Sequence, residues 1–405
     1  MQTNTGVDKI EKVVRNKHFE DSYTRLKNYC ENESFKGWDP YDGLNSKIFQ
    51  AIPFIRSNRI ARLCWIQFFK RSPINFRRPL KVLKEHNNKG LGLFLAGYCK
   101  EFKTNPTRAV EGKIIQLAEI LVNNRSTQYA GSSWGYNFDW QARAFFQPKN
   151  TPTVVATTFI SSALLDAYEI TKNDKFLNTA RTACNFILHD LNRTYDEKGN
   201  FAFSYSPLDH SVVFNASLLG SRLLARVSSI TGENGLIEEA KKSVAFCCDR
   251  QQSDGSWRYG ALPFHQWIDN FHTGYNLECI NDYMKFSGDA TFQKSLDRGF
   301  TYYIHTFFTE EGIPRYYSNN VYPIDIHSPA QLVITLSKLE KFKTYKKLLD
   351  NVLDWTINNM QSDKGYFYYQ INKYFSSKIA YMRWAQAWMF YALSTYFYEE
   401  SKITN

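Results

Sequence analysis

Apolar residues along most of the chain recur every three or four positions, which is the period of an amphipathic α-helix. One apolar stripe covers 160–168 and another covers 176–187, and the polar stretch 171–174 separates them. The same alternation continues in both directions, with Asp174 and Asp289 placed where helix N-caps are expected. We therefore predict further helices over 45–55, 58–71, 90–103, 107–123, 211–229, 236–252, 270–286, 290–308, 328–338, 342–360 and 380–398.

Short segments that start with glycine and continue with aromatic residues separate the predicted helix pairs. They begin at Gly131, Gly199, Gly255, Gly312 and Gly365, and the last three intervals are 56, 57 and 53 residues. A helical hairpin of this length cannot bury its apolar face alone, but hairpins that pack side by side can. The sequence predicts an all-α fold, an (α/α)6-type toroid of antiparallel helical hairpins with short aromatic β-like turns at the rim. We expect a helical extension over 1–36 and a single toroid domain over 37–400.

The composition is that of a globular chain with an unusually aromatic interior, because 43% of the residues are hydrophobic and 16% are aromatic. The formal net charge is +11, with Lys and Arg found along the whole chain and only short runs such as Arg77-Arg78. This charge predicts either an ordinary solvated basic surface or a preference for an acidic ligand. The sequence has no nucleic-acid-binding motif, so nucleic acid is not an expected partner.

The seven cysteines form no CxxC motif, and all but Cys30 lie in apolar helical stretches. We therefore expect buried free thiols in a reducing compartment. The first 20 residues are polar and charged, unlike a signal peptide, and no stretch has the roughly 18 consecutive apolar residues of a membrane span. The expected location is cytoplasmic, with no integral membrane segment.

Polar residues follow each aromatic turn by about 10 to 15 positions, at the start of the next inner helix. In a toroid these helix starts lie at one end of the ring, so residues that are distant in sequence meet there. Asp at a helix start is also a common N-cap, so a purely structural role is the alternative for each pair of Asp and His. The candidate catalytic residues are His210, Asp269, His272, Tyr275, Asp325, His327 and Tyr381.

Aromatic rings in the turns suit the apolar faces of sugar rings, although core packing is the alternative for each of them. Arg side chains suit bidentate binding of a carboxylate or phosphate group, or else form salt bridges at the surface. The candidate substrate-binding residues are Trp134, Tyr136, Asp139, Asp209, Trp257, Tyr259, Arg315, Tyr317, Tyr368 and Arg383.

Three reactions fit these side chains. Proton abstraction next to a uronate carboxylate, which leads to epimerisation or elimination, needs a base such as His272 or His210, an acid such as Tyr275 or Tyr381, and an arginine that stabilises the enolate-like charge. Hydrolysis instead needs two carboxylates, which the aspartates of the same set offer. Metal binding is the third, but the sequence has no HxxxH or Cys-His spacing, so we expect neither a metal nor another cofactor.

One segment runs from Lys242 through Phe246 and Gln251 to Gly255-Ser-Trp257 and resembles the QW-type repeat of α/α toroids such as terpene cyclases. In that family the Gln and the Trp tie the end of an outer helix to the next turn, so the resemblance implies the fold and no chemistry. Terpene cyclase or prenyltransferase-like activity is the least favoured alternative. The chain has no DxDD or DDxxD motif and no zinc-type set of Asp, Cys and His.

Four further stretches carry a second resemblance: WDPYDGL at 38–44, DNFHTGY at 269–275, DIHS at 325–328 and MRWAQAWM at 382–389. They are similar to a family of toroid proteins encoded in bacterial capsule and exopolysaccharide clusters, and the similarity spans most of 35–400. Some members are labelled delta-aminolevulinate dehydratase, but this chain has neither the strand–helix alternation of a barrel nor a zinc-binding cysteine cluster. The fold is also similar to glucuronyl C5-epimerase catalytic domains and to six-hairpin glycosidases and lyases.

This resemblance implies a carbohydrate-active protein of surface-polysaccharide biosynthesis, with an oligo- or polysaccharide as ligand and other polysaccharide-assembly proteins among its partners. Together with the basic charge, it predicts modification of an acidic glycan by His, Tyr and Arg proton transfer, or hydrolysis by carboxylates. The main alternative is a non-catalytic glycan-binding or assembly scaffold, which would lack acid–base pairs within about 3 Å of each other.

Overall fold

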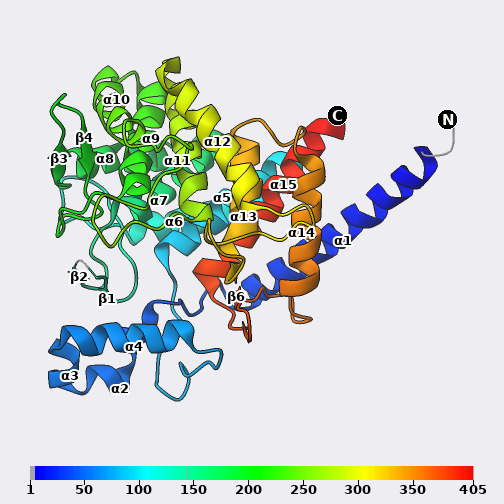
Figure 1. Ribbon diagram of the computed structural model, residues 1–405, viewed down its shortest axis with the longest axis horizontal. Coiled ribbons are helices and arrows are strands. Elements are labelled where there is room, and N and C mark those ends of the chain that lie inside the picture. Colours follow the sequence, from blue (N-terminus) through cyan, green and yellow to red (C-terminus); the bar gives the residue numbers. More distant parts are fainter. Residues whose placement is uncertain (1–4, 144, 405) are drawn as a thin grey trace.

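The computed structural model describes residues 5–143 and 145–404, and Figure 1 labels its elements. In this part of the chain, six helices form an inner layer in which each packs against the next and α15 packs against α5, which closes the ring. They are α5 (Asn88–Thr104), α7 (Val154–Thr171), α9 (Phe214–Thr231), α11 (Asn270–Ser287), α13 (His327–Lys338) and α15 (Trp388–Thr404). The outer layer consists of α6 (Arg108–Asn123), α8 (Asp174–His189), α10 (Asn234–Cys248), α12 (Gln293–Phe307), α14 (Lys346–Met360) and α1 (Thr5–Asn32).

Helix α1 takes the sixth outer position although it lies far in sequence from its neighbours α14 and α15. The ring of Phe19 lies 5.4 Å from the ring of Tyr396 on α15. The side-chain amide of Gln361, just after α14, donates to the Ser22 carbonyl oxygen of α1 at 3.0 Å and to the Gly365 carbonyl oxygen at 2.9 Å. The N-terminal helix is therefore the outer partner of α15, and it completes the outer layer.

The Gln251–Trp257 segment ties an outer helix to the next turn, as its sequence predicts. The Gln251 side chain donates to the carbonyl oxygens of Gly255 and Ser295, both at 2.9 Å. Gly255 has a φ of +92°, and a Cβ there would lie 2.5 Å from a backbone carbonyl oxygen of α12, so the turn requires glycine. Gln361 makes the same pair of contacts between α14 and α1.

Inner and outer helices differ in how their side chains are buried. Of the 18 residues of inner helix α9, 15 are buried, whereas the outer helix α8 buries one stripe that includes Phe176, Ala180 and Ile187. Small residues let the inner helices approach closely, since a Cβ at Gly97 on α5 would lie 2.5 Å from the ring of Phe390 on α15. The ring therefore has a dense interior made by its inner helices.

Short antiparallel strands form part of the predicted aromatic turns at the rim. Strand β1 pairs with β2, β3 pairs with β4, and β6 lies between β5 and β7. Their bounds are β1 (Trp140–Gln141), β2 (Phe146–Gln147), β3 (Arg193–Tyr195), β4 (Phe201–Phe203), β5 (Ile324–Asp325), β6 (Gln370–Ile371) and β7 (Ser376–Ser377).

A separate layer of short helices lies beside the ring, below it in Figure 1. It contains η1 (Asp42–Asn45), α2 (Lys47–Gln50), α3 (Pro53–Ser57) and α4 (Arg59–Arg71). Leu44, Phe49 and Ile66 form a small core of their own within it. Helix α4 also contacts strand β1, so the layer is joined to the rim of the ring.

The structure departs from the predicted elements in a few places. The predicted helix 45–55 is divided because Pro53 starts a new helix, α3. Asn173 and not Asp174 caps α8, accepting the Lys175 N–H at 3.1 Å, whereas Asp289 accepts the N–H of Thr291 as expected of an N-cap. The predicted helix 380–398 begins as the π-helix η3 (Met382–Ala387).

All seven cysteines are free, but they are not all buried as expected, since Cys64 is exposed on α4. Cys64 lies in an apolar stretch, but α4 buries only one side, against a small core, and Cys64 lies outside that side. Among the described residues, no helix is long and apolar enough to cross a membrane.

Candidate active site

Backbone hydrogen bonds bring the starts of the inner helices together at one end of the ring, which we call the mouth. The N–H at the start of one inner helix donates to the carbonyl oxygen of the aromatic turn that precedes the next, over 2.9 to 3.3 Å. The pairs are Val154 with Tyr205, Phe214 with Tyr259, Asn270 with Tyr316, Ile326 with Tyr369, and Met382 with Trp38. The four stretches 38–44, 269–275, 325–328 and 382–389 consequently meet at the mouth.

His272 and Asp269 form a hydrogen-bonded pair at the start of α11. One oxygen of the buried Asp269 caps the helix by accepting the His272 N–H at 3.0 Å. The other oxygen lies 2.7 Å from Nδ1 of His272 and accepts the Trp267 indole N–H at 2.9 Å. The carboxylate therefore holds the Nδ1–H tautomer, which leaves a lone pair on Nε2. Because the imidazole is 20% exposed and its Nε2 has no partner among the described residues, His272 is placed to act as a base.

His327 and Tyr275 form a second pair deeper in the mouth, with 2.9 Å between the tyrosine oxygen and Nε2. Burial raises the pKa of Tyr275 well above its usual value and lowers the pKa of His327 well below its own. A protonated tyrosine therefore donates to a neutral imidazole, whose proton lies on Nδ1. This Nδ1 is buried and has no hydrogen-bond partner among the described residues, so it is available to a ligand oxygen.

Aromatic rings enclose both histidines. The Phe271 ring lies 4.0 Å from the His272 ring and stacks on the His327 ring at 4.3 Å. Trp388 of α15 lies 4.2 Å from His327 on another side. On the outer side, the Tyr259 ring lies 4.7 Å from His272. The two imidazoles therefore share one aromatic wall, which suits the apolar face of a sugar.

Asp325 positions its neighbours in the mouth. One oxygen accepts the backbone N–H of His327 and the indole N–H of Trp384, both at 2.9 Å, and the other accepts the Gln370 amide at 2.5 Å. Burial raises the pKa of Asp325 to about 6. With both oxygens engaged, this carboxyl orients the start of α13 and the Trp384 ring.

Two buried ion pairs hold the 38–44 stretch against the mouth. Arg383 donates to both oxygens of Asp39, at 2.5 and 2.8 Å, and Arg77 donates to Asp42 at 2.7 Å. Arg77 also donates to the hydroxyl oxygen of the buried Tyr381 at 2.9 Å. The guanidinium of Arg383 is therefore already clamped on a carboxylate of the protein, so its predicted role as a clamp for the substrate is not supported.

Lys89 carries a buried amine that the sequence prediction did not include. Its Nζ lies 4.2 Å from the centre of the Phe159 ring, 5.5 Å from that of Trp388 and 5.6 Å from that of Tyr275. It forms no salt bridge with a described residue, and burial, followed by the nearby positive charge of Arg383, lowers its pKa well below the usual value. The sequence feature that could have indicated this lysine is its position as a single charged residue at the start of the apolar, glycine-rich helix 88–104.

Three of the predicted substrate-binding tyrosines lie at the mouth. Tyr136 is buried, with its hydroxyl 3.3 Å from that of Tyr205 and its ring 5.2 Å from the Arg383 guanidinium. Tyr259 lies beside His272, as described above, and stacks on the Trp267 ring at 4.4 Å. Tyr317 is half-buried with its ring 4.4 Å from the Tyr316 ring, and the nearby Lys70 partly offsets the rise in its pKa that burial causes.

The structure places three other predicted rings away from the mouth. The buried indoles of Trp134 and Trp257 donate to the carbonyl oxygens of Leu121 on α6 and Cys247 on α10, so both belong to the packing between the layers. Tyr368 lies under Lys378, while its neighbour Tyr369 is buried against Tyr381 at 5.0 Å. Adjacent residues in an extended segment point to opposite sides, so the inward ring is that of Tyr369.

Four other predicted polar residues have structural partners or face solvent. Both oxygens of Asp209 are occupied by the N–H and hydroxyl groups of Ser206 and Ser211, and His210 beside it is exposed. Asp139 accepts the Lys149 N–H at 2.7 Å, which fastens a loop. Arg315 donates to a carbonyl oxygen of α12 at 3.5 Å. The two aspartates therefore stabilise turns, which is the structural role considered for them, and His210 lies on the surface. Arg315 forms no salt bridge with a described residue, unlike the alternative considered for the arginines.

No protein-family model and no curated protein sequence matches this chain. Solved structures with the same fold include cellobiose 2-epimerase from Bacillus thermoamylovorans, with a TM-score of 0.61 and 13% identity over 78% of this chain and 88% of that one. The GH76 α-mannanase of Bacteroides thetaiotaomicron gives a TM-score of 0.62 with 11% identity, over 78% and 87%. The unsaturated glucuronyl hydrolase of Streptococcus agalactiae gives 0.59 with 11% identity, over 96% and 92%. These likenesses confirm the predicted all-α fold, an (α/α)6-type toroid.

Proposed function

We propose that this protein is a carbohydrate-active enzyme that transfers protons on an acidic sugar, as an epimerase or a lyase. The proposal rests on one observation, namely which polar atoms of the mouth have no hydrogen-bond partner. Among the described residues, Nε2 of His272, Nδ1 of His327 and Nζ of Lys89 have no hydrogen-bond partner, whereas the oxygens of Asp39, Asp42, Asp269 and Asp325 all accept hydrogen bonds. Bases and cations are therefore available to a ligand, and carboxylate pairs for hydrolysis are not.

In the proposed reaction, Nε2 of His272 removes the proton next to the carboxylate of a uronate residue, and the electron pair of the broken C–H bond moves into the carboxylate. Lys89 and Nδ1 of His327 stabilise the negative charge that develops on the carboxylate oxygens. Return of a proton to the opposite face gives the epimer. Cleavage of the neighbouring C–O bond, whose glycosidic oxygen takes up a proton from solvent as it leaves, gives an unsaturated sugar instead.

The two hydrogen-bonded histidines support an enzyme rather than a non-catalytic scaffold. Nδ1 of His272 lies 2.7 Å from a carboxylate and Nε2 of His327 lies 2.9 Å from a tyrosine hydroxyl, both within reach for proton transfer. The resemblance of four mouth-forming stretches to capsule and exopolysaccharide proteins supports surface-polysaccharide biosynthesis as the pathway. The solved structures of the same fold include sugar epimerases and glucuronyl hydrolases, which agrees with a sugar substrate.

The test is incubation of uronate-containing oligosaccharides with the protein in heavy water, followed by mass spectrometry and proton NMR of the sugar. The proposal expects one deuterium at C5 or an unsaturated product. H272Q is expected to reduce the rate at least about 100-fold, while H305Q, an exposed histidine on α12, serves as the matched control.

The variant H210Q distinguishes between His272 and His210, the two candidate bases from the sequence. It is expected to retain full activity because His210 is exposed to solvent. Binding of the sugars without exchange or cleavage would favour the scaffold, and release of saturated sugars without exchange would favour hydrolysis. Either result would contradict the proposal.

A further inference from the structure

The positive charge of the protein is concentrated in residues 43–84, which form most of the layer beside the ring and which we call the basic layer. This segment contains ten of the 50 Lys and Arg residues and none of the 39 Asp and Glu residues. Because the whole chain carries +11, the remainder carries a net charge of only +1. This segment contains no long run of basic residues. Its high net charge arises because it lacks Asp and Glu.

Most cations of the basic layer have no carboxylate partner. Arg77 pairs with Asp42 and Lys84 pairs with Glu33. The other eight form no salt bridge with any described residue: Lys47, Arg56, Arg59, Arg62, Lys70, Arg71, Arg78 and Lys81. Six of the eight are exposed, whereas Arg62 and Lys70 are half-buried and contact Gln141 and Tyr41. The exposed charges therefore add to one positive field on this side of the molecule.

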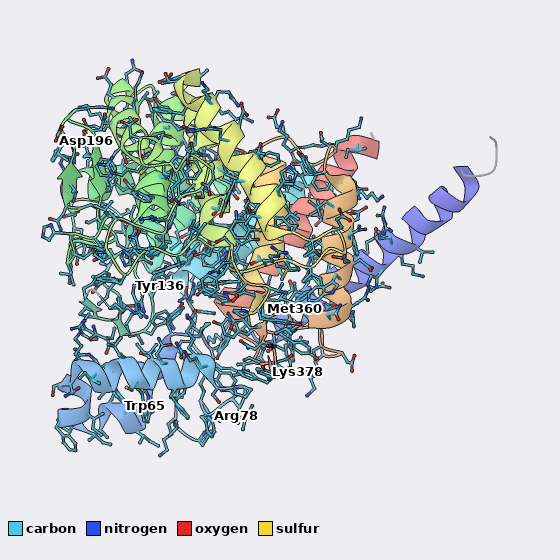
Figure 2. All side chains as sticks on the ribbon, viewed as in Figure 1. Trp65, Arg78, Tyr136, Asp196, Met360 and Lys378 are labelled. Carbon is cyan, nitrogen blue, oxygen red and sulfur yellow. The ribbon has the colours of Figure 1, made fainter. Side chains whose placement is uncertain are left out.

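Large apolar side chains are exposed in the same layer. Phe54 on α3 is 75% exposed, Ile60 on α4 is 70% exposed and Ile74 after α4 is 63% exposed. Ile60, Cys64 and Phe68 are four residues apart, so they lie along one face of α4, and all three are exposed. Figure 2 shows this layer below the ring, with Trp65 and Arg78 labelled on it. An apolar stripe flanked by unpaired cations therefore faces solvent.

We propose that the basic layer docks on the surface of an anionic lipid bilayer. Helices that lie in a bilayer interface combine buried Phe and Ile side chains with Lys and Arg that meet anionic headgroups. A second copy of the chain fits less well, because it would bring two strongly positive layers together. Nucleic acid would meet the charges but would leave the exposed isoleucines without apolar partners.

Docking would bring the mouth close to the bilayer. On its inner side, Lys70 of the basic layer donates to the Tyr41 hydroxyl at 3.0 Å, and Arg77 contacts Asp42 and Tyr381 of the mouth. A glycan attached to a lipid carrier would therefore meet the mouth when the layer is docked. This last step rests on the proposed function, whereas the docking itself does not.

The test is flotation of the full-length protein with vesicles of phosphatidylcholine and phosphatidylglycerol, compared with vesicles of phosphatidylcholine alone, without any sugar. Binding is expected only with the anionic vesicles and is expected to weaken as salt is added. R56Q/R71Q removes two exposed cations and is expected to weaken binding by roughly 10- to 30-fold, at about five-fold per charge. K294Q/K347Q removes two exposed lysines from α12 and α14 and is the matched control.

The apolar contribution is tested with F54S/I60S, with Y195S on strand β3 as the control for an exposed ring. F54S/I60S is expected to weaken vesicle binding at least about 10-fold, with an unchanged circular dichroism spectrum. Three results would overturn the proposal: no binding of the wild type to anionic vesicles, equal losses in the variants and their controls, or a wild-type dimer in light scattering that F54S/I60S converts to monomer.

Because no sugar is present, these outcomes are independent of the heavy-water experiment. Vesicle binding without deuterium exchange would retain the docking surface and refute the proposed chemistry. Exchange without vesicle binding would retain the chemistry and refute the docking.

Discussion

Replacement of Lys89 with methionine is expected to make the protein more stable and to abolish its binding of acidic sugars. The Lys89 side chain is 3% exposed and its amine lies among the rings of Phe159, Tyr275 and Trp388 without a carboxylate partner in the described chain. Methionine is similar in length and apolar, so it fills the same space without burying an amine. A buried lysine that lowers the stability of the fold is typical of a functional site, because function and stability are often in conflict there.

The magnitude follows from two opposing contributions. A polar group buried without a hydrogen bond costs about 1–3 kcal/mol, and attraction between the amine and the ring faces offsets roughly 1 kcal/mol of this when the amine is charged. We therefore expect Lys89→Met to raise the free energy of unfolding by up to roughly 2 kcal/mol at pH 7.

The effect also has a predicted pH dependence. The folded pKa of Lys89 is lowered below the unfolded value, so the folded protein binds fewer protons and the penalty is present below the folded pKa. The part of the penalty that comes from the charge disappears as pH rises toward the unfolded pKa of about 10.4, so the difference between wild type and variant is expected to shrink in the same direction.

The assay is urea unfolding followed by tryptophan fluorescence at pH 7 and at pH 9.5, with K294M as the control at an exposed lysine. The control is expected to change the free energy of unfolding by less than about 0.5 kcal/mol. Destabilisation of Lys89→Met by more than about 1 kcal/mol would refute the reasoning, because it would mean that the amine makes a favourable contact in the free protein.

Three further predictions concern stability. D39N is expected to destabilise the fold by about 3–5 kcal/mol, measured by urea unfolding, because it leaves the guanidinium of Arg383 buried without its charge partner. G97A is expected to cost about 1–3 kcal/mol because its Cβ would overlap a buried ring. G112A, at an exposed position of α6 where a Cβ would have no atom within 4 Å, is expected to stabilise by about 0.5–1 kcal/mol, and equal thermal shifts of the two variants would contradict this. Burial raises the pKa of Glu278 to about 7, above its unfolded value, so the free energy of unfolding should fall as pH rises from about 4.5 to 7. E278Q should reduce this pH dependence in unfolding curves measured at pH 5, 6 and 7.

The repeat in the sequence was sufficient to predict the ring, because each hairpin carries its own local signals. The glycine of each turn, the apolar stripes and the Gln251–Trp257 segment are all readable within about 60 residues. The position of α1 was not readable in this way. Its packing on α14 and α15 depends on contacts between opposite ends of the chain, such as Gln361 with Ser22 over 339 residues.

The candidate site was partly predictable. Sequence reasoning placed Asp269, His272 and Tyr275 on one helix start, where the helical repeat fixes their spacing. It could not distinguish inward from outward rings in irregular turns, so it selected Tyr368 in place of Tyr369. It also missed Lys89, because a single lysine in a helix is ordinarily a surface residue.

The proposed reaction requires that an acidic sugar bind between His272 and His327. The decisive measurement is a titration of the isotope-labelled protein with a uronate oligosaccharide, followed through the imidazole resonances in carbon–proton NMR spectra. We predict that the resonances of His272 and His327 move together with the same dissociation constant, while those of His210 and His305 stay in place. Movement confined to His210 or His305, or no imidazole response to a sugar that the protein converts, would contradict the account.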